Sequence, residues 1–104
     1  TKEDSHFEHK IVNELAFPLT RIKGISILEY RTPSTLDSWS PNTFTDITEY
    51  FDEKQRQLML FKSQKDRWYF QEDLLKSFHS NFQSYKKGIK YVEKFKTVQF
   101  YDRD

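Results

Sequence analysis

The sequence contains no cysteine and only 2 glycines in 104 residues, and each scarcity excludes a class of site. Without thiols, disulfide bonds and thiolate zinc sites are impossible. With so few glycines, the chain cannot form a glycine-rich phosphate loop of the Rossmann or Walker type. Any metal must therefore be held by histidine, aspartate or glutamate side chains.

Charge and hydropathy point neither to nucleic acid nor to a membrane. The chain has 17 Lys and Arg against 16 Asp and Glu, for a net charge of +1. A nucleic-acid-binding domain usually carries a basic excess, which is missing here. No stretch approaches the roughly 20 apolar residues of a membrane span, and none has the form of a secretory signal. We therefore expect a cytoplasmic protein with no nucleic-acid partner and no membrane span.

Aromatic residues are plentiful, with 10 Phe, 6 Tyr and 2 Trp. Disordered chains are poor in aromatics, so this composition predicts a folded chain of one domain at most. The segment richest in chemical groups stands at the very start of the sequence. We therefore expect the chain to be the C-terminal portion of a domain whose N-terminal half packs against it.

Two histidines three residues apart mark the start of an expected helix. Ser5 and Glu8 have the spacing of a capping box, which makes Ser5 the N-cap, His6 the first helical residue and His9 the fourth. Residues three apart lie on neighbouring parts of one helix face. The positive end of the helix dipole disfavours imidazolium, and neutral imidazole is the form that binds zinc or polarises a carbonyl.

Hydrophobic spacing predicts an α/β chain of about three helices and three short strands. Pro18 is expected to kink the first helix or tighten its last turn, with Gly24 closing the region. Asp46 is expected to cap the second helix, and Gly88 to stop the third. The expected helices span residues 6–19, 47–62 and 71–87, and the expected strands span 25–30, 43–45 and 92–101.

The motif His6-Phe7-Glu8-His9 resembles the second metal motif, typically His-x-Asp-His, of the LmbE/PIG-L family of zinc-dependent N-acetyl-sugar deacetylases. Further segments resemble that family's distal half in the same order, and the resemblance covers most of residues 4–98. It implies part of a Rossmann-like three-layer fold. The segments are Arg31–Ser34, Pro41–Phe44, Asp46–Thr48, Lys62–Gln64 and the region of Glu93 and Phe95.

The resemblance also implies roles for the motif. His9 matches the family's distal metal ligand, and His6 matches the histidine that stabilises the oxyanion or protonates the leaving amine. Glu8 stands where the family usually has Asp, which assists that histidine; alternatively, Glu8 only completes the cap on Ser5. The implied substrate is an N-acetylated amino sugar or sugar conjugate.

The long loop after the first strand contributes three further candidates for substrate binding, Arg31, Trp39 and Asn42. Each has a structural alternative: Trp39 as a lid over the core and Asn42 as a turn residue, for example. His79, on the third expected helix, is interpreted as a solvated or hydrogen-bonded surface residue.

The family's proximal motif, His-Pro-Asp-Asp, supplies the other metal ligands and the base, and this sequence does not contain it. The chain alone is therefore expected to bind Zn²⁺ poorly and to be inactive, with the metal completed by ligands outside it. The alternative hypothesis is a non-catalytic α+β interaction module with surface histidines, as a monomer or a homo-oligomer. A third hypothesis is a degenerate enzyme that kept the sugar-binding loop and lost catalysis.

Overall fold

The computed structural model describes residues 1–61, 71–81 and 88–102. In these ranges the chain forms three α-helices, two short 3₁₀ helices and three strands, which confirms the predicted mixture of helix and strand. It divides into two compact units, one of Thr1–Thr43 with Lys94–Asp104 and one of Phe44–Glu93. No helix in the described residues is long and apolar enough to cross a membrane.

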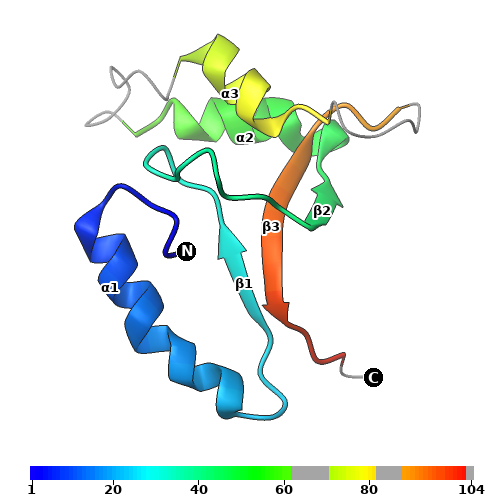
Figure 1. The fold of residues 1–104 in the computed structure, drawn as a ribbon. Helices are drawn as coiled ribbons and strands as arrows, with labels where there is room; N and C mark the ends of the chain where they lie inside the picture. The colour runs from blue at the N-terminus through cyan, green and yellow to red at the C-terminus, as the bar shows by residue number, and fades with distance from the viewer. Residues whose placement is uncertain (62–70, 82–87, 103–104) are drawn as a thin grey trace. The chain divides into compact units, whose positions relative to one another are not determined.

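The strands form one sheet in the order β1-β3-β2, where β1 is Ile27–Tyr30, β2 is Thr43–Asp46 and β3 is Val92–Gln99 (Figure 1). β1 and β3 are antiparallel, with Tyr30 opposite Phe95, and the register shifts between Ile27 and Leu28. All three strands fall where the hydrophobic pattern predicts them.

In the first unit, α1 (Phe7–Ala16) continues directly into the 3₁₀ helix η1 (Phe17–Arg21). Pro18 therefore tightens the last turn, one of the two outcomes predicted for it. Gly24 then adopts φ 89°, a left-handed conformation that glycine reaches without strain. α1 lies along β1 (Figure 1), and the Asn13 amide donates to Glu29 Oε2 at 3.3 Å.

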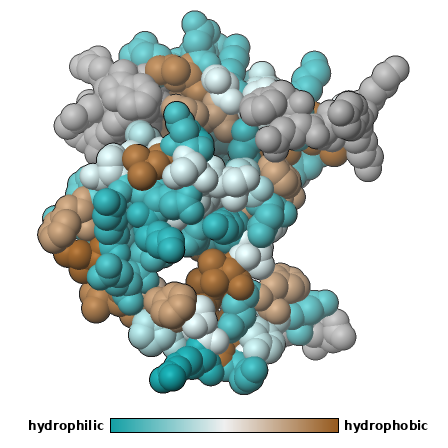
Figure 2. Space-filling model, viewed as in Figure 1, coloured by the Kyte–Doolittle hydropathy of each residue, from teal (hydrophilic) through white to brown (hydrophobic). Residues whose placement is uncertain are grey.

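The apolar stripe of α1 is not covered by the described part of the chain. No residue of this helix is buried. Phe7 is 73% exposed, Val12 64% and Leu15 75%, and Phe17 at the start of η1 is 70% exposed. Figure 2 shows apolar side chains along the outer side of α1. An amphipathic helix normally buries this stripe, so another surface is needed to cover it.

In the second unit, a 3₁₀ helix η2 (Thr48–Tyr50) leads into α2 (Phe51–Leu58), and α3 (Glu72–His79) follows. Asp46 accepts a hydrogen bond from the Thr48 backbone N–H at 3.0 Å, but it is not the predicted cap of the second helix. The N-cap is Ile47 for η2 and Tyr50 for α2, neither with a side-chain cap, and α2 ends at Leu58, before the predicted end at residue 62. The core centres on Phe51, which is 1% exposed and stacks on Tyr91 with ring centroids 4.0 Å apart.

The third helix is shorter than predicted. Ser80 is extended at φ −63° and ψ 136° and forms a β-bridge with Tyr91, and the Asn81 N–H donates to the Lys90 carbonyl at 2.9 Å. The prediction of helix is therefore wrong at Ser80 and Asn81, because backbone pairing replaces the helical bonds. The interpretations of Lys62–Gln64, of residues 68–70 and of residues 82–87 lie outside the described residues.

Candidate functional site around Asp4 and His9

A buried carboxylate stands at the centre of the candidate site. Asp4 is 1% exposed. Its Oδ1 accepts from the His6 backbone N–H at 2.7 Å. Its Oδ2 accepts from His9 Nδ1 at 3.0 Å and from Thr32 Oγ1 at 3.1 Å. A buried carboxylate costs free energy unless it is hydrogen-bonded, and here both oxygens are satisfied.

The same hydrogen bonds keep Asp4 ionised. Burial alone would raise the pKa of this carboxyl. Hydrogen bonds from Ser34, the His6 N–H, His9 and Thr32 outweigh the burial and hold the pKa of Asp4 well below its usual range. At neutral pH the group is therefore a carboxylate, which can only accept hydrogen bonds.

Backbone pairing brings the two motifs together. Asp4 and Thr35 form an antiparallel bridge, the Ser5 N–H donates to the Ser34 carbonyl at 2.9 Å, and the Leu36 N–H donates to the Glu3 carbonyl at 2.9 Å. The loop closes on itself because the Thr32 N–H donates to Thr35 Oγ1 at 2.8 Å. Residues 31–34 thus lie against the start of α1, although more than 20 residues separate them in sequence.

The helix cap differs from the predicted one. The N-cap of α1 is His6, whose Nδ1 accepts from the Glu8 N–H at 3.2 Å. The capping box on Ser5 is wrong, because both the N–H and the Oγ of Ser5 donate to the Ser34 carbonyl. His9 is consequently the third helical residue rather than the fourth.

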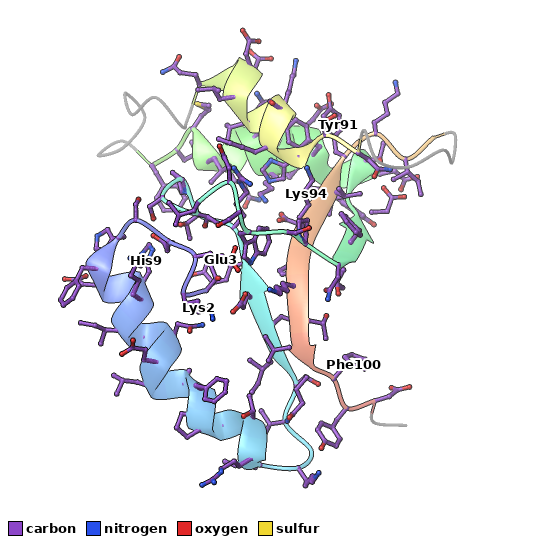
Figure 3. All side chains as sticks on the ribbon, in the orientation of Figure 1. Lys2, Glu3, His9, Tyr91, Lys94 and Phe100 are labelled. Atoms are coloured by element: carbon purple, nitrogen blue, oxygen red, sulfur yellow. The ribbon has the colours of Figure 1, made fainter. Side chains whose placement is uncertain are left out.

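The hydrogen bonds assign opposite tautomers to the two imidazoles. His9 donates from Nδ1 to an ionised carboxylate, so its hydrogen is on Nδ1 and Nε2 keeps its lone pair in the neutral ring. His6 accepts at Nδ1, so its hydrogen is on Nε2. The rings stack with centroids 4.5 Å apart and an interplanar angle of 20°. Figure 3 labels His9 on the first turn of α1, beside the segment of Lys2 and Glu3.

The other two polar candidates lie near this cluster in sequence. Glu8 is exposed on the first turn of α1 and contributes its backbone N–H to the cap. Arg31 is half-buried, with Nη2 at 3.9 Å from Asp37 Oδ1, and it precedes Thr32 of the cluster. The catalytic role of Glu8 and the substrate-binding role of Arg31 stay predictions.

Trp39 and Asn42 each make structural contacts, and their substrate-binding roles stay predictions. Trp39 is 3% exposed and its indole N–H donates to Glu29 Oε1 at 3.2 Å. Asn42 Oδ1 accepts from the Thr97 N–H at 2.8 Å, and the Asn42 N–H donates to the Phe95 carbonyl at 2.9 Å. Asn42 thus serves strand pairing instead of a turn.

The third histidine is in the second unit and belongs to a separate cluster. His79 Nδ1 donates to the Leu75 carbonyl at 2.8 Å, and its Nε2 accepts from Lys54 Nζ at 2.7 Å. Lys54 also donates to Glu93. With a side chain only 13% exposed, His79 is a hydrogen-bonded residue, as interpreted from the sequence, although it is not at the surface.

The donor set near His9 fits one metal ligand and not a complete site. The described residues contain no group of three or more His, Cys, Asp or Glu side chains that could hold a metal ion. A catalytic zinc site usually has three protein ligands. Within the described chain, His9 Nε2 has no hydrogen-bond partner, so it is the one nitrogen of this cluster oriented as a ligand would be.

Comparison with known proteins adds no assignment. No protein-family model matches the chain, and no curated protein or solved structure is significantly similar to it.

Sequence reasoning missed Asp4 and gave no role to Thr32 and Ser34 within their motif. One signal for Asp4 was present: an aspartate two residues before the N-cap can accept from the N–H of the N-cap residue, the Asx turn seen here. Nothing in the spacing predicts that the hydroxyls of Thr32 and Ser34 meet this carboxylate, because the contact depends on the Asp4–Thr35 bridge.

Proposed function

We propose that this chain is the distal portion of a metal-dependent N-deacetylase of the LmbE/PIG-L type, acting on an N-acetylated amino sugar or sugar conjugate. One observation carries the proposal. The two motifs that resemble the family, His6–His9 and Arg31–Ser34, lie more than 20 residues apart in the sequence. Even so, the His9 and Thr32 side chains and the His6 backbone N–H all donate to the same buried carboxylate, Asp4. Segments that build one site are expected to meet in this way.

The two imidazoles support the division of roles. A metal-binding histidine usually donates its other ring N–H to a carboxylate, and His9 does so to Asp4 at 3.0 Å. His6 presents an N–H at Nε2, the form that stabilises an oxyanion or donates toward a leaving amine. We assign His9 as the metal ligand and His6 as the hydrogen-bond donor, with Glu8 as its candidate assistant.

The resident metal would be Zn²⁺ or a similar divalent ion, completed by ligands outside this chain. A zinc ion lowers the pKa of its bound water to about 7, which supplies the nucleophile for amide hydrolysis. The exposed stripe of Phe7, Val12 and Leu15 on α1 is the surface against which the segment with those ligands would pack. In this proposal the sheet is part of a Rossmann-like three-layer fold.

The proposal is tested by expressing the complete reading frame and measuring its zinc content and its deacetylase activity. We expect about one zinc per chain, together with release of acetate from N-acetylglucosamine conjugates, both lost in His9→Ala. Asp52→Asn, at an exposed carboxylate of α2, is the matched control. A folded full-length protein that binds no zinc and releases no acetate would refute the proposal.

The second candidate is a non-catalytic interaction module, favoured by the exposed apolar stripe of α1 and by the absence of a three-ligand metal group in the described residues. It predicts that the 104-residue chain melts sharply as a stable monomer or homo-oligomer. The deacetylase proposal predicts gradual unfolding with aggregation, because an apolar helix face stays uncovered.

A further inference from the structure

We propose that Asp4 is the positioning residue of this site: its carboxylate sets which nitrogen of His9 carries the hydrogen, and asparagine cannot replace it. The tautomer claim stands on the hydrogen bonds alone. Its consequence for metal binding rests on the proposed function.

The two oxygens of Asp4 have different partners. Oδ1 accepts from the His6 backbone N–H at 2.7 Å, and a backbone N–H can only donate. Oδ2 faces His9 Nδ1 at 3.0 Å and Thr32 Oγ1 at 3.1 Å. The Ser34 hydroxyl also binds this carboxylate and lies 3.2 Å from His9 Nδ1. The ring nitrogen and both hydroxyls can act either as donor or as acceptor.

This asymmetry fixes the orientation of an asparagine at position 4. Its amide oxygen must take the place of Oδ1, because an amide NH₂ there would face the His6 N–H donor to donor. The NH₂ group then takes the place of Oδ2 and donates to His9 Nδ1. A nitrogen that accepts carries no hydrogen, so the hydrogen of the neutral ring moves to Nε2.

The rest of the cluster can accommodate the change. The hydroxyls of Thr32 and Ser34 lie 3.0 Å apart and rotate freely enough to exchange donor and acceptor roles. Asp4→Asn therefore keeps the shape of the side chain and leaves each hydrogen bond of the cluster with a donor and an acceptor. What changes is the His9 tautomer, because the ring hydrogen moves from Nδ1 to Nε2. The outward nitrogen of His9 then carries a hydrogen instead of the lone pair that a metal needs.

The experiment is ¹⁵N NMR of the histidine side chains in the 104-residue chain, its Asp4→Asn variant and the control Asp52→Asn. The protonated and bare nitrogens of a neutral imidazole have well-separated ¹⁵N shifts, so the spectrum assigns each tautomer. We expect His9 to carry its hydrogen on Nδ1 in the parent chain and the control, and on Nε2 in Asp4→Asn. We expect His6 to keep Nε2–H in all three.

A folded Asp4→Asn chain in which His9 keeps Nδ1–H would overturn the inference, as would Nε2–H in the parent chain. If Asp4→Asn does not fold, Thr32→Val and Ser34→Ala decide instead. Each removes one hydroxyl and leaves the Asp4 carboxylate opposite His9, so Nδ1–H is expected to persist. Inversion by either hydroxyl variant would show that Asp4 is not the determinant.

Zinc binding by the complete reading frame and by its Asp4→Asn variant separates this inference from the proposed function, because that proposal places the other metal ligands outside these 104 residues. Weakening of zinc binding at His9 by roughly 10- to 100-fold in Asp4→Asn is expected of a residue that orients a metal ligand. If the tautomers behave as expected but the folded complete protein binds no zinc, the proposed function fails and the positioning role of Asp4 stands.

Discussion

The two units each hold a histidine against an oxygen acceptor, and the difference between the two sites separates a candidate ligand from a structural residue. His9 and His79 both donate from Nδ1, to the Asp4 carboxylate and to the Leu75 carbonyl. At Nε2 they diverge. His79 accepts there from Lys54 at 2.7 Å, whereas His9 Nε2 has no partner in the described part of the chain.

The surroundings of His79 and His9 also separate a structural residue from a candidate ligand. The His79 side chain is 13% exposed and its ring lies 5.4 Å from that of Phe51, which is only 1% exposed. The His9 side chain is 41% exposed and stacks on His6. A histidine whose two ring nitrogens are both hydrogen-bonded has a structural role. A histidine that is oriented through one nitrogen and has no partner at the other can bind a metal ion there.

The largest expected effect is in the second unit. Phe51→Ala removes a ring that is 1% exposed and stacks on Tyr91, so we expect a loss of roughly 3–5 kcal/mol in the free energy of unfolding. Urea denaturation followed by circular dichroism measures it. A loss below about 1 kcal/mol would mean that the cluster around His79 is not the core of this unit.

The direct contrast is between two alanine variants. His79→Ala deletes two hydrogen bonds and a core contact, so we expect a loss of roughly 2 kcal/mol in stability. His9→Ala removes a half-exposed ring and one of several hydrogen bonds to the Asp4 carboxylate, and should cost less than His79→Ala. Parallel urea titrations compare them, and an equal or reversed order would contradict the division of roles.

Acid should weaken the first unit through Asp4. The pKa of Asp4 is lowered in the folded chain, so the folded state binds this proton less readily than the unfolded state. The resulting stability is complete above the unfolded pKa of about 4 and is lost as the pH falls below it. We expect the free energy of unfolding to fall progressively as the pH is lowered from about 5 to 2.

The check is the urea midpoint of the parent chain and of Asp4→Asn at several acidic pH values. Asparagine does not titrate in this range, so the difference between the two proteins should shrink as the pH falls. A difference that stays constant with pH would show that the Asp4 carboxyl does not contribute in its ionised form.

The smallest effect belongs to the surface of α2. Glu53 pairs with Arg56 at 2.5 Å, and its pKa is lowered to about 2 by hydrogen bonds from Arg56 and Gln57. This pair is exposed, and solvent screens exposed ion pairs. Glu53→Gln should leave the melting temperature unchanged, and a clear drop would show that surface pairs matter as much as the buried Asp4 cluster.

The sequence predicted the elements better than the contacts among them. The local sequence located all three strands, and the proline at position 18 located the tightened last turn, since these depend on local preferences. The end of α3 was missed because the pairing of Ser80 with Tyr91 is a long-range contact. No feature of the local sequence shows that Ser80 pairs with Tyr91 instead of continuing the helix.

The candidate site was predictable only in part. The pair of His6 and His9 was visible from its spacing, and their rings do meet. Trp39 was proposed for substrate binding from its place in a long loop, but its burial and its hydrogen bond to Glu29 could not be predicted from the loop sequence. Asp4 was overlooked because its partners Thr32 and Ser34 arrive from a distant segment.

The most direct measurement is a zinc chloride titration of the 104-residue chain, followed by ¹⁵N NMR at its 3 histidines. If His9 is the oriented ligand, its Nε2 signal shifts first, His6 follows only through ring stacking, and His79 does not respond while the chain stays folded. Binding by one ligand is weak, so the order of response is the readout. A response that begins at His79, or a His9 that remains silent at every zinc concentration, would contradict the distinction between the two histidine sites.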